Sequence, residues 1–247
     1  MLPGWEITSI AGKYASVFHP PGQNTPRAAL LYLHPLGGGE LPGDNPTFTE
    51  ELAQRGWACC APQGGQCWWL DRRVPEFDAE RSPESFLLDD VLPWMRHRWR
   101  LDSRPIPVAG ISMGGQGAIR LGFRHPDRCP IVASIAGAFD FHEFYGQGTP
   151  LDTIYPDRER CRQDTAILQL NPQRVPAHIW FACDPDDAVW YRGNDRLHEK
   201  LQAYGLPHQA DLSTSAGGHT WDYFDAMMPP MFHFLAEALR LESRRLL

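Results

Sequence analysis

The chain has 247 residues, of which 43% are hydrophobic and 21% charged, and its formal net charge is −7. A chain of this length can bury a large core without metals or disulfides. It has no apolar run approaching the roughly 20 residues that a membrane span needs, and its negative charge argues against binding to a phosphate backbone. We therefore expect neither a membrane nor a nucleic acid among its partners.

The first residues and the cysteines indicate a compartment. The segment 1–17 has no basic region followed by a continuous apolar run, so it shows no secretory signal, and we expect a cytoplasmic protein. The six cysteines form no CxxC pair and no Cys/His spacing suited to zinc, and several fall within predicted strands. We expect no structural metal and no disulfide framework.

From residue 28 onward, apolar β-rich segments alternate with helical patterns, after an opening pair of strands joined by AGK. This order is typical of a parallel sheet with crossover helices, and it predicts a single α/β domain over 1–247 with about eight strands. Strands are predicted near 5–10, 13–18, 28–34, 57–62, 106–110, 131–137, 178–183 and 208–213. Helices are predicted near 45–56, 82–99, 113–124, 190–204 and 220–241.

The segment 138–177 interrupts the alternation and is longer than the usual connection in a compact domain. Long irregular connections are commonly functional loops that cover or line a site. The segment is therefore predicted to form a small cap or lid.

The stretch VAGISMGGQGA, residues 108–118, places Ser112 between Gly110 and Gly114. A predicted buried strand precedes Ser112 and a predicted helix follows it, which is the setting of a nucleophile elbow. Glycines on both sides would permit a strained turn and let strand and helix approach closely. The GxSxG pattern is short and arises by chance in some chains, so a nucleophilic serine here needs partners.

A serine hydroxyl at neutral pH needs a general base, normally a histidine oriented by a carboxylate. FACDPDDAVW follows the predicted strand 178–183, and SAGGHTWDYF, which contains His219, follows the last predicted strand. The order Ser, Asp, His is therefore met. Position alone does not choose among Asp184, Asp186 and Asp187, because all three lie near the end of one strand.

Three segments carry a resemblance to a known family: GISMGGQGA, SIAGAFD and GGHTWDYF. They are similar to segments of the α/β-hydrolase fold and, within it, of the esterase group that includes esterase D and the S-formylglutathione hydrolases. The resemblance spans most of the chain. It implies an α/β-hydrolase fold, Ser112 as nucleophile and His219 as base.

In related hydrolases the acid usually lies three residues beyond a small residue. With Cys183 in the small position, this register selects Asp186, and Asp187 is the next choice. Asp184 directly precedes a proline and suits a turn. Asp187 would then stabilise the first turn of the following helix.

An oxyanion hole needs two N–H donors. One is predicted to be the backbone N–H of Met113, which follows the nucleophile at a helix N-terminus. The other is expected in LHPLGGGE, which resembles an HGGG-type loop with Pro35 in place of a glycine. Because proline has no N–H, the donor is Leu36 or Gly37, and the family's register favours Leu36.

Trp68 and Trp69 follow the end of a strand, the edge where open α/β sheets bind ligands. They are candidates for a substrate pocket, and core positions are the alternative. His34, His142 and His233 lie near candidate loops but show no other reason to be catalytic.

These features predict a serine carboxylesterase that hydrolyses small or short-acyl esters through an acyl-enzyme, with a Ser-His-Asp triad and without cofactor or metal. A thioesterase of the S-formylglutathione hydrolase type is the alternative among enzymes. A catalytically silent hydrolase-fold binding protein is the alternative from another class. The sequence leaves the oligomeric state open, a homodimer included.

Overall fold

An eight-stranded sheet forms the centre of the protein. The computed structural model describes residues 1–23, 25–36, 42–101 and 104–245. The strands are β1 (Trp5–Ile10), β2 (Lys13–Phe18), β3 (Ala28–Leu33), β4 (Trp57–Pro62), β5 (Val108–Ile111), β6 (Ile131–Ile135), β7 (His178–Ala182) and β8 (Gln209–Asp211). Their order across the sheet is β1-β2-β4-β3-β5-β6-β7-β8. The pairs β1–β2 and β2–β4 are antiparallel and the remaining pairs are parallel, which confirms the predicted α/β-hydrolase fold.

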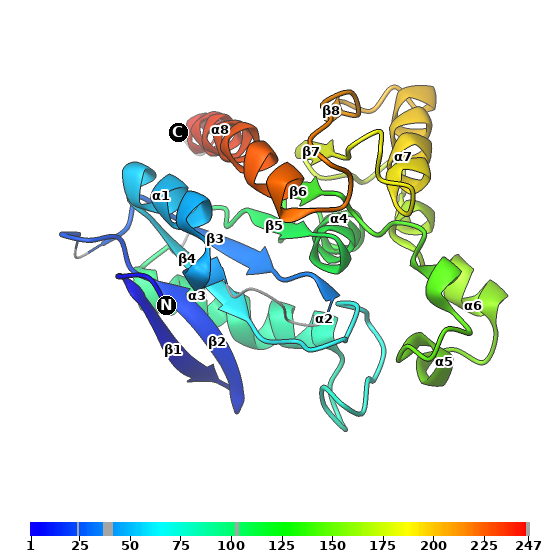
Figure 1. The fold of residues 1–247 in the computed structure, drawn as a ribbon. Coiled ribbons are helices and arrows are strands. Elements are labelled where there is room, and N and C mark those ends of the chain that lie inside the picture. The colour runs from blue at the N-terminus through cyan, green and yellow to red at the C-terminus, as the bar shows by residue number, and fades with distance from the viewer. Residues whose placement is uncertain (24, 37–41, 102–103, 246–247) are drawn as a thin grey trace.

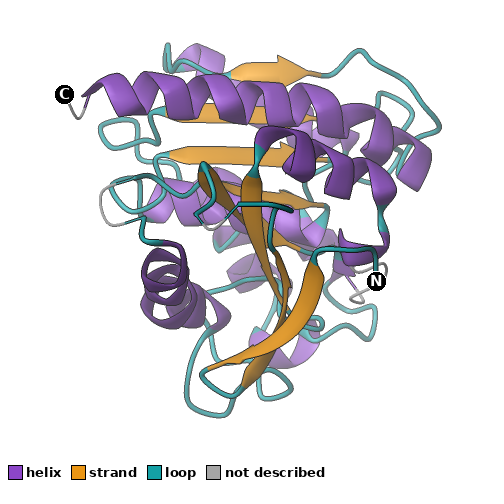
Figure 2. Ribbon diagram, turned by 90° about the vertical axis from the view of Figure 1, so that its left-hand side faces the viewer, coloured by secondary structure: helices purple, strands orange, loops and turns teal. Residues whose placement is uncertain are grey.

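Helices cover both faces of this sheet. They are α1 (Pro46–Arg55), α2 (Pro83–Phe86), α3 (Leu92–Trp99), α4 (Met113–Arg124), α5 (Leu151–Ile154), α6 (Arg158–Gln163), α7 (Tyr191–Ala203) and α8 (Trp221–Arg245). Helices α1 and α8 lie side by side on one face, and α3 and α4 lie on the other (Figures 1 and 2). Because both faces are covered, every residue of β3, β4, β5 and β6 is buried.

The helix boundaries follow from local capping chemistry. The Asn45 side chain accepts the N–H of Phe48 at 2.8 Å before α1, and Gly56 ends that helix with φ 66°, as its sequence indicates. The Ser82 hydroxyl accepts the N–H of Ser85 at 3.1 Å at the start of α2. The predicted helix 82–99 contains one feature that its periodicity did not indicate, a π-helical turn over Leu87–Val91.

The segment 138–177 contains α5 and α6 and two 3₁₀ turns, Phe141–Phe144 and Ala166–Gln169. The carboxylate of Asp164, between α6 and the second turn, holds this segment to the domain. It accepts hydrogen bonds from Arg120 of α4 at 2.7 Å and from Arg72 at 2.8 Å. Arg120 also pairs with the buried carboxylate of Glu84 in α2. An ion network thus joins the segment to the helix that follows Ser112.

None of the helices that the structure describes is both long enough and apolar enough to cross a membrane.

Candidate active site

Ser112 occupies a sharp turn between β5 and α4. Its φ of 54° lies in the left-handed region that non-glycine residues rarely adopt. A Cβ atom on Gly114 would lie 1.9 Å from the carbonyl oxygen of Leu33, and one on Gly110 would lie 2.4 Å from the backbone of Gly114. Both flanking glycines are therefore required by close backbone contact, and the predicted order of strand, sharp turn and helix is present around Ser112.

His219 lies in the loop between β8 and α8 and reaches the serine. Its Nε2 is 3.1 Å from Ser112 Oγ, and its Nδ1 is 2.8 Å from Asp187 Oδ2. Because an ionised carboxylate only accepts hydrogen bonds, Nδ1 carries the proton. Nε2 is then free to accept the hydroxyl proton of Ser112, which is the arrangement of a catalytic triad.

The predicted position of the acid is wrong by one residue. Asp186 is exposed, and its Oδ2 accepts a hydrogen bond from the Ser215 hydroxyl at 2.6 Å. The reason lies in the turn after β7. The carboxylate of Asp184 accepts the N–H of Asp186 at 2.8 Å, and this side-chain turn directs Asp186 outward and Asp187 inward.

Asp187 is held as an anion. Burial opposes its ionisation, but hydrogen bonds from His219 and from the backbone N–H of Trp190 outweigh that effect, so the pKa of Asp187 lies below its usual value. Its Oδ1 accepts the N–H groups of Val189 at 3.0 Å and Trp190 at 2.9 Å, just before α7. The sequence predicts this helix-stabilising role for Asp187 and makes it the second choice for the acid, and the residue makes both sets of contacts.

Asp184 fixes the loop that carries His219. It is fully buried, and its Oδ2 accepts the backbone N–H groups of Ala216 at 2.7 Å and Gly218 at 2.9 Å. Burial raises the pKa of Asp184, but the hydrogen bonds lower it by more, so the pKa lies below its usual value. The predicted turn role of Asp184 is confirmed, and its bonds to the histidine loop are an addition that the sequence did not indicate.

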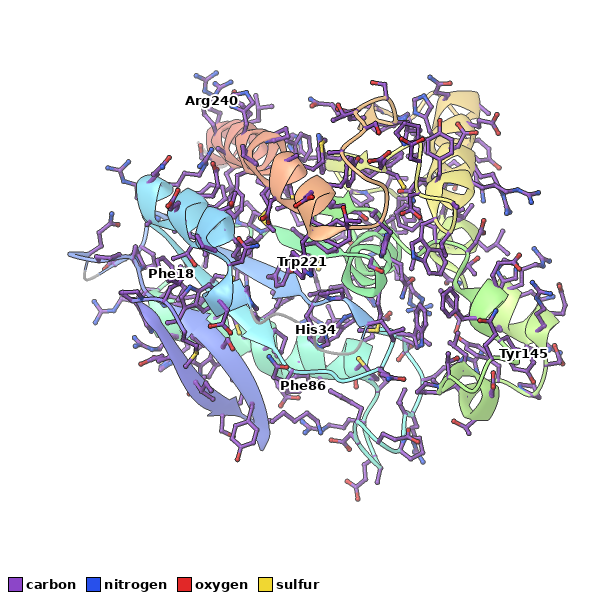
Figure 3. All side chains as sticks on the ribbon, in the orientation of Figure 1. Phe18, His34, Phe86, Tyr145, Trp221 and Arg240 are labelled. Carbon is purple, nitrogen blue, oxygen red and sulfur yellow. The ribbon has the colours of Figure 1, made fainter. Side chains whose placement is uncertain are left out.

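Ser112 and His219 both line a pocket of about 390 Å³. Figure 3 shows Trp221, the first residue of α8, with His34 below it in that view. Phe144, from the predicted cap segment, lines the pocket and stacks on Trp190 with ring centroids 5.0 Å apart. The aromatic side chains in the pocket wall are Trp68, Phe144, Trp190, Trp221 and Phe224.

A family model described as "Putative esterase" matches residues 47–235 of this chain. The chain belongs to this esterase family. Two curated proteins of similar sequence are also named as esterases. An esterase of Mycobacterium tuberculosis is 26% identical over 65% of this chain, which covers 41% of that protein's length. An acetyl esterase of Caldicellulosiruptor saccharolyticus is 21% identical over 84% of this chain and 83% of its own length.

Solved structures of similar fold extend over nearly the whole of this chain. A ferulic acid esterase superposes with a TM-score of 0.75 at 16% identity, covering 95% of this chain and 98% of its own. An S-formylglutathione hydrolase from Agrobacterium tumefaciens superposes with a TM-score of 0.69 at 16% identity, covering 92% and 89%. At these identities the similarity establishes the α/β-hydrolase fold.

The two predicted pocket tryptophans have different surroundings. Trp68 lines the pocket, as predicted. Trp69 is not among the pocket-lining residues that the structure describes, so its predicted pocket position is wrong and the core alternative holds. Its ring is buried against Gly117 of α4, and its indole N–H donates to the carbonyl of His34 at 3.3 Å. Strand geometry places both residues at the sheet edge, but it does not indicate which ring turns inward.

Of the predicted oxyanion donors, Met113 follows Ser112 in the chain and Leu36 lines the same pocket. Met113 is the first residue of α4, where a backbone N–H has no acceptor within the helix. Pro35 and Leu36 line the same pocket as Ser112. Gly37, the alternative to Leu36, lies outside the described residues.

A buried polar residue supports this part of the site. Gln116, in the first turn of α4, donates its side-chain amide to the carbonyl of Trp68 and so holds the loop after β4. No pattern in the sequence singled out Gln116. The six cysteines are buried with free thiols. Within the described ranges, no group of three or more His, Cys, Asp or Glu side chains is arranged to hold a metal ion.

Proposed function

We propose that this esterase is a serine carboxylesterase that hydrolyses small, short-acyl esters through an acyl-enzyme intermediate. The observation that carries the proposal is the continuous contact from buried Asp187 through His219 to the hydroxyl of Ser112, where Ser112 and His219 line a pocket large enough for a small ester. A strained elbow holds the hydroxyl at the pocket, where a reacting carbonyl can reach it.

In the proposed reaction, Ser112 Oγ attacks the ester carbonyl while His219 Nε2 takes its proton. The tetrahedral oxyanion accepts hydrogen bonds from the N–H groups of Leu36 and Met113. His219 then returns the proton to the leaving alkoxide, which departs as the alcohol, and leaves the acyl group on Ser112. Water then attacks this second ester while His219 takes its proton, and His219 returns that proton to Ser112 Oγ as the acid is released. Asp187 remains ionised and stabilises the imidazolium, and no cofactor or metal takes part.

The pocket supports a preference for short acyl groups. Its volume of about 390 Å³ lies near the lower end of the range for ligand pockets, and bulky aromatic rings form its wall. The same triad can act on thioesters, so the leaving group is a separate question. A panel of p-nitrophenyl acetate, butyrate and octanoate, with the matching thioesters, measures acyl length and leaving group independently.

Hydrolysis by a Ser112→Ala variant is the direct test. We expect p-nitrophenyl acetate turnover to fall to the background rate, because no other nucleophile contacts His219 Nε2 among the described residues. Ser215→Ala is the matched control, since that hydroxyl bonds to the exposed Asp186 outside the triad. Retained turnover in Ser112→Ala would contradict the mechanism.

A binding protein that has kept the fold without activity is separated from an enzyme by a fluorophosphonate probe. We expect rapid labelling at Ser112 and none in Ser112→Ala. An unlabelled wild-type chain would favour the binding protein. The cytoplasmic location, the small-molecule ester as the partner and a homodimer remain predictions from the sequence.

A further inference from the structure

His34 lies directly after β3, at the edge of the sheet where the pocket opens (Figure 3). It is 2% exposed. Its Nδ1 is 2.7 Å from the carbonyl oxygen of Pro35, and its Nε2 is 2.9 Å from the backbone nitrogen of Gly64. The proposed triad does not use this ring, although the ring lies beside the loop that carries Leu36.

The two contacts define one tautomer of His34. A backbone N–H only donates, so the N–H of Gly64 donates to an unprotonated Nε2. A carbonyl only accepts, so Nδ1 carries the proton and donates it to Pro35. The neutral ring satisfies both partners at once, and burial lowers the pKa of His34, which favours this neutral form.

The carbonyl that His34 holds belongs to the same peptide group as the N–H of Leu36. In a trans peptide the C=O and N–H bonds point in opposite directions. Anchoring the carbonyl on the His34 side therefore turns the N–H of Leu36 away from the ring. Pro35 and Leu36 both line the pocket that contains Ser112, so this peptide group lies at the pocket wall. A hydrogen bond to the carbonyl also polarises the peptide and strengthens its N–H as a donor.

Further contacts restrict the ring itself. The indole of Trp69 packs edge-on against His34 with centroids 5.2 Å apart, and its N–H donates to the His34 carbonyl at 3.3 Å. Gly64 lies in the loop after β4, the loop that also carries Trp68. His34 thus connects the loop after β3 to the loop after β4, and it is itself clamped from both sides.

We propose that His34 is a positioning residue for the oxyanion, which fixes the Pro35–Leu36 peptide so that the N–H of Leu36 faces the carbonyl under attack by Ser112. This inference rests on the proposed esterase function. It assigns His34 no proton transfer and no contact with substrate.

Two substitutions of His34 test its two ring nitrogens separately. His34→Asn places an amide nitrogen near the position of Nδ1 and keeps a donor for Pro35. His34→Gln places its amide oxygen near the position of Nε2 and keeps an acceptor for Gly64, but it has no donor at the Nδ1 position. We expect His34→Gln to lower kcat for p-nitrophenyl acetate by about 100-fold with little change in KM, because a misdirected donor weakens the transition state alone. His34→Asn should retain most of the wild-type kcat.

Wild-type kcat in His34→Gln, or equal losses in both variants, would overturn the inference. The proposed function is judged separately by wild-type turnover and its loss in Ser112→Ala. A second measurement does not depend on activity or on the folding of variants. The ¹⁵N chemical shifts of the wild-type His34 ring should show a protonated Nδ1 and a bare Nε2. A proton on Nε2 would overturn the inference even if the esterase proposal holds.

Discussion

The two sides of the site are held by different chemistry. On the histidine side, buried carboxylates determine the geometry, with Asp187 on the ring of His219 and Asp184 on the backbone of its loop. On the side of the proposed oxyanion donors, which we call the neutral side, uncharged groups determine the geometry. There His34 holds the Pro35 carbonyl and Gln116 holds the Trp68 carbonyl.

This difference follows the charge that develops during the proposed reaction. His219 becomes a cation when it takes the serine proton, and a fixed anion beside it stabilises that state. The oxyanion forms on the other side, where a nearby carboxylate would oppose it and oriented N–H dipoles favour it. Single substitutions can remove one of these charged or neutral groups at a time. The expected changes in turnover, stability and acyl preference differ widely in size.

Asp187→Asn removes the anion beside His219 and should have the largest effect. We expect turnover of p-nitrophenyl acetate to fall by roughly 10⁴-fold, which is the loss that follows when the orienting acid of a serine protease triad is replaced by its amide. Asp186→Asn is the matched control, because this neighbouring carboxylate is exposed and bonds to Ser215. If Asp186→Asn lost the activity and Asp187→Asn kept it, the assignment of the acid would be reversed.

Leu36→Pro removes the proposed donor on the neutral side. We expect kcat to fall by about 10²- to 10³-fold, the usual result of deleting one oxyanion donor. Leu36→Ala keeps the backbone N–H and shortens only the side chain, so it should keep most of the activity. Equal rates in the two variants would show that the donor is another group.

Asp184→Asn replaces the buried anion that holds the histidine loop. At pH 7 we expect a loss of about 1.5 to 3 kcal/mol in the free energy of unfolding, because hydrogen bonds to a charged group are lost. The pKa of Asp184 is lowered by folding, so its contribution is complete above the unfolded value of 3.8 and disappears as the pH falls through the folded value. Urea unfolding from pH 7 to pH 3 should show the variant approaching the wild type at the acid end. A constant difference across this range would argue against a charged Asp184.

Phe144→Ala tests the contact between the two sides. The Phe144 ring packs against Trp68 of the neutral side, with centroids 6.1 Å apart, and against Trp190 of the charged side, with centroids 5.0 Å apart. We expect the ratio of kcat/KM for butyrate over acetate esters to rise by about tenfold, since the shortened side chain makes room for added methylenes. An unchanged ratio would place the acyl group elsewhere in the pocket.

The sequence predicted the features that depend on local pattern or chain order. The elbow at Ser112 follows from two glycines between a strand and a helix, and His219 follows from its place after the last strand. Asp187 could not be chosen because the turn after β7 depends on a side-chain hydrogen bond to Asp184, which no periodicity records.

Residues of the neutral side were harder to predict for a different reason. Apart from the adjacent Pro35, the partners of His34 are Gly64 and Trp69, which are 30 and 35 residues away along the chain. A histidine after a strand looks the same in sequence whether its ring is exposed or clamped between two loops. The sequence-based prediction of Trp69 in the pocket is wrong for the same reason. Only the packing of α4 against the loop after β4 turns its ring inward.

The acyl group trapped on the protein would test the proposed mechanism most directly. Wild-type chain is mixed with excess p-nitrophenyl acetate, quenched in acid within milliseconds, digested and measured by mass spectrometry. The mechanism predicts an acetyl group on Ser112 in the peptide that contains it, formed with a burst of p-nitrophenol and absent from Ser112→Ala. Steady turnover with no acetyl group on Ser112 at any quench time, or with the group on another residue, would contradict it.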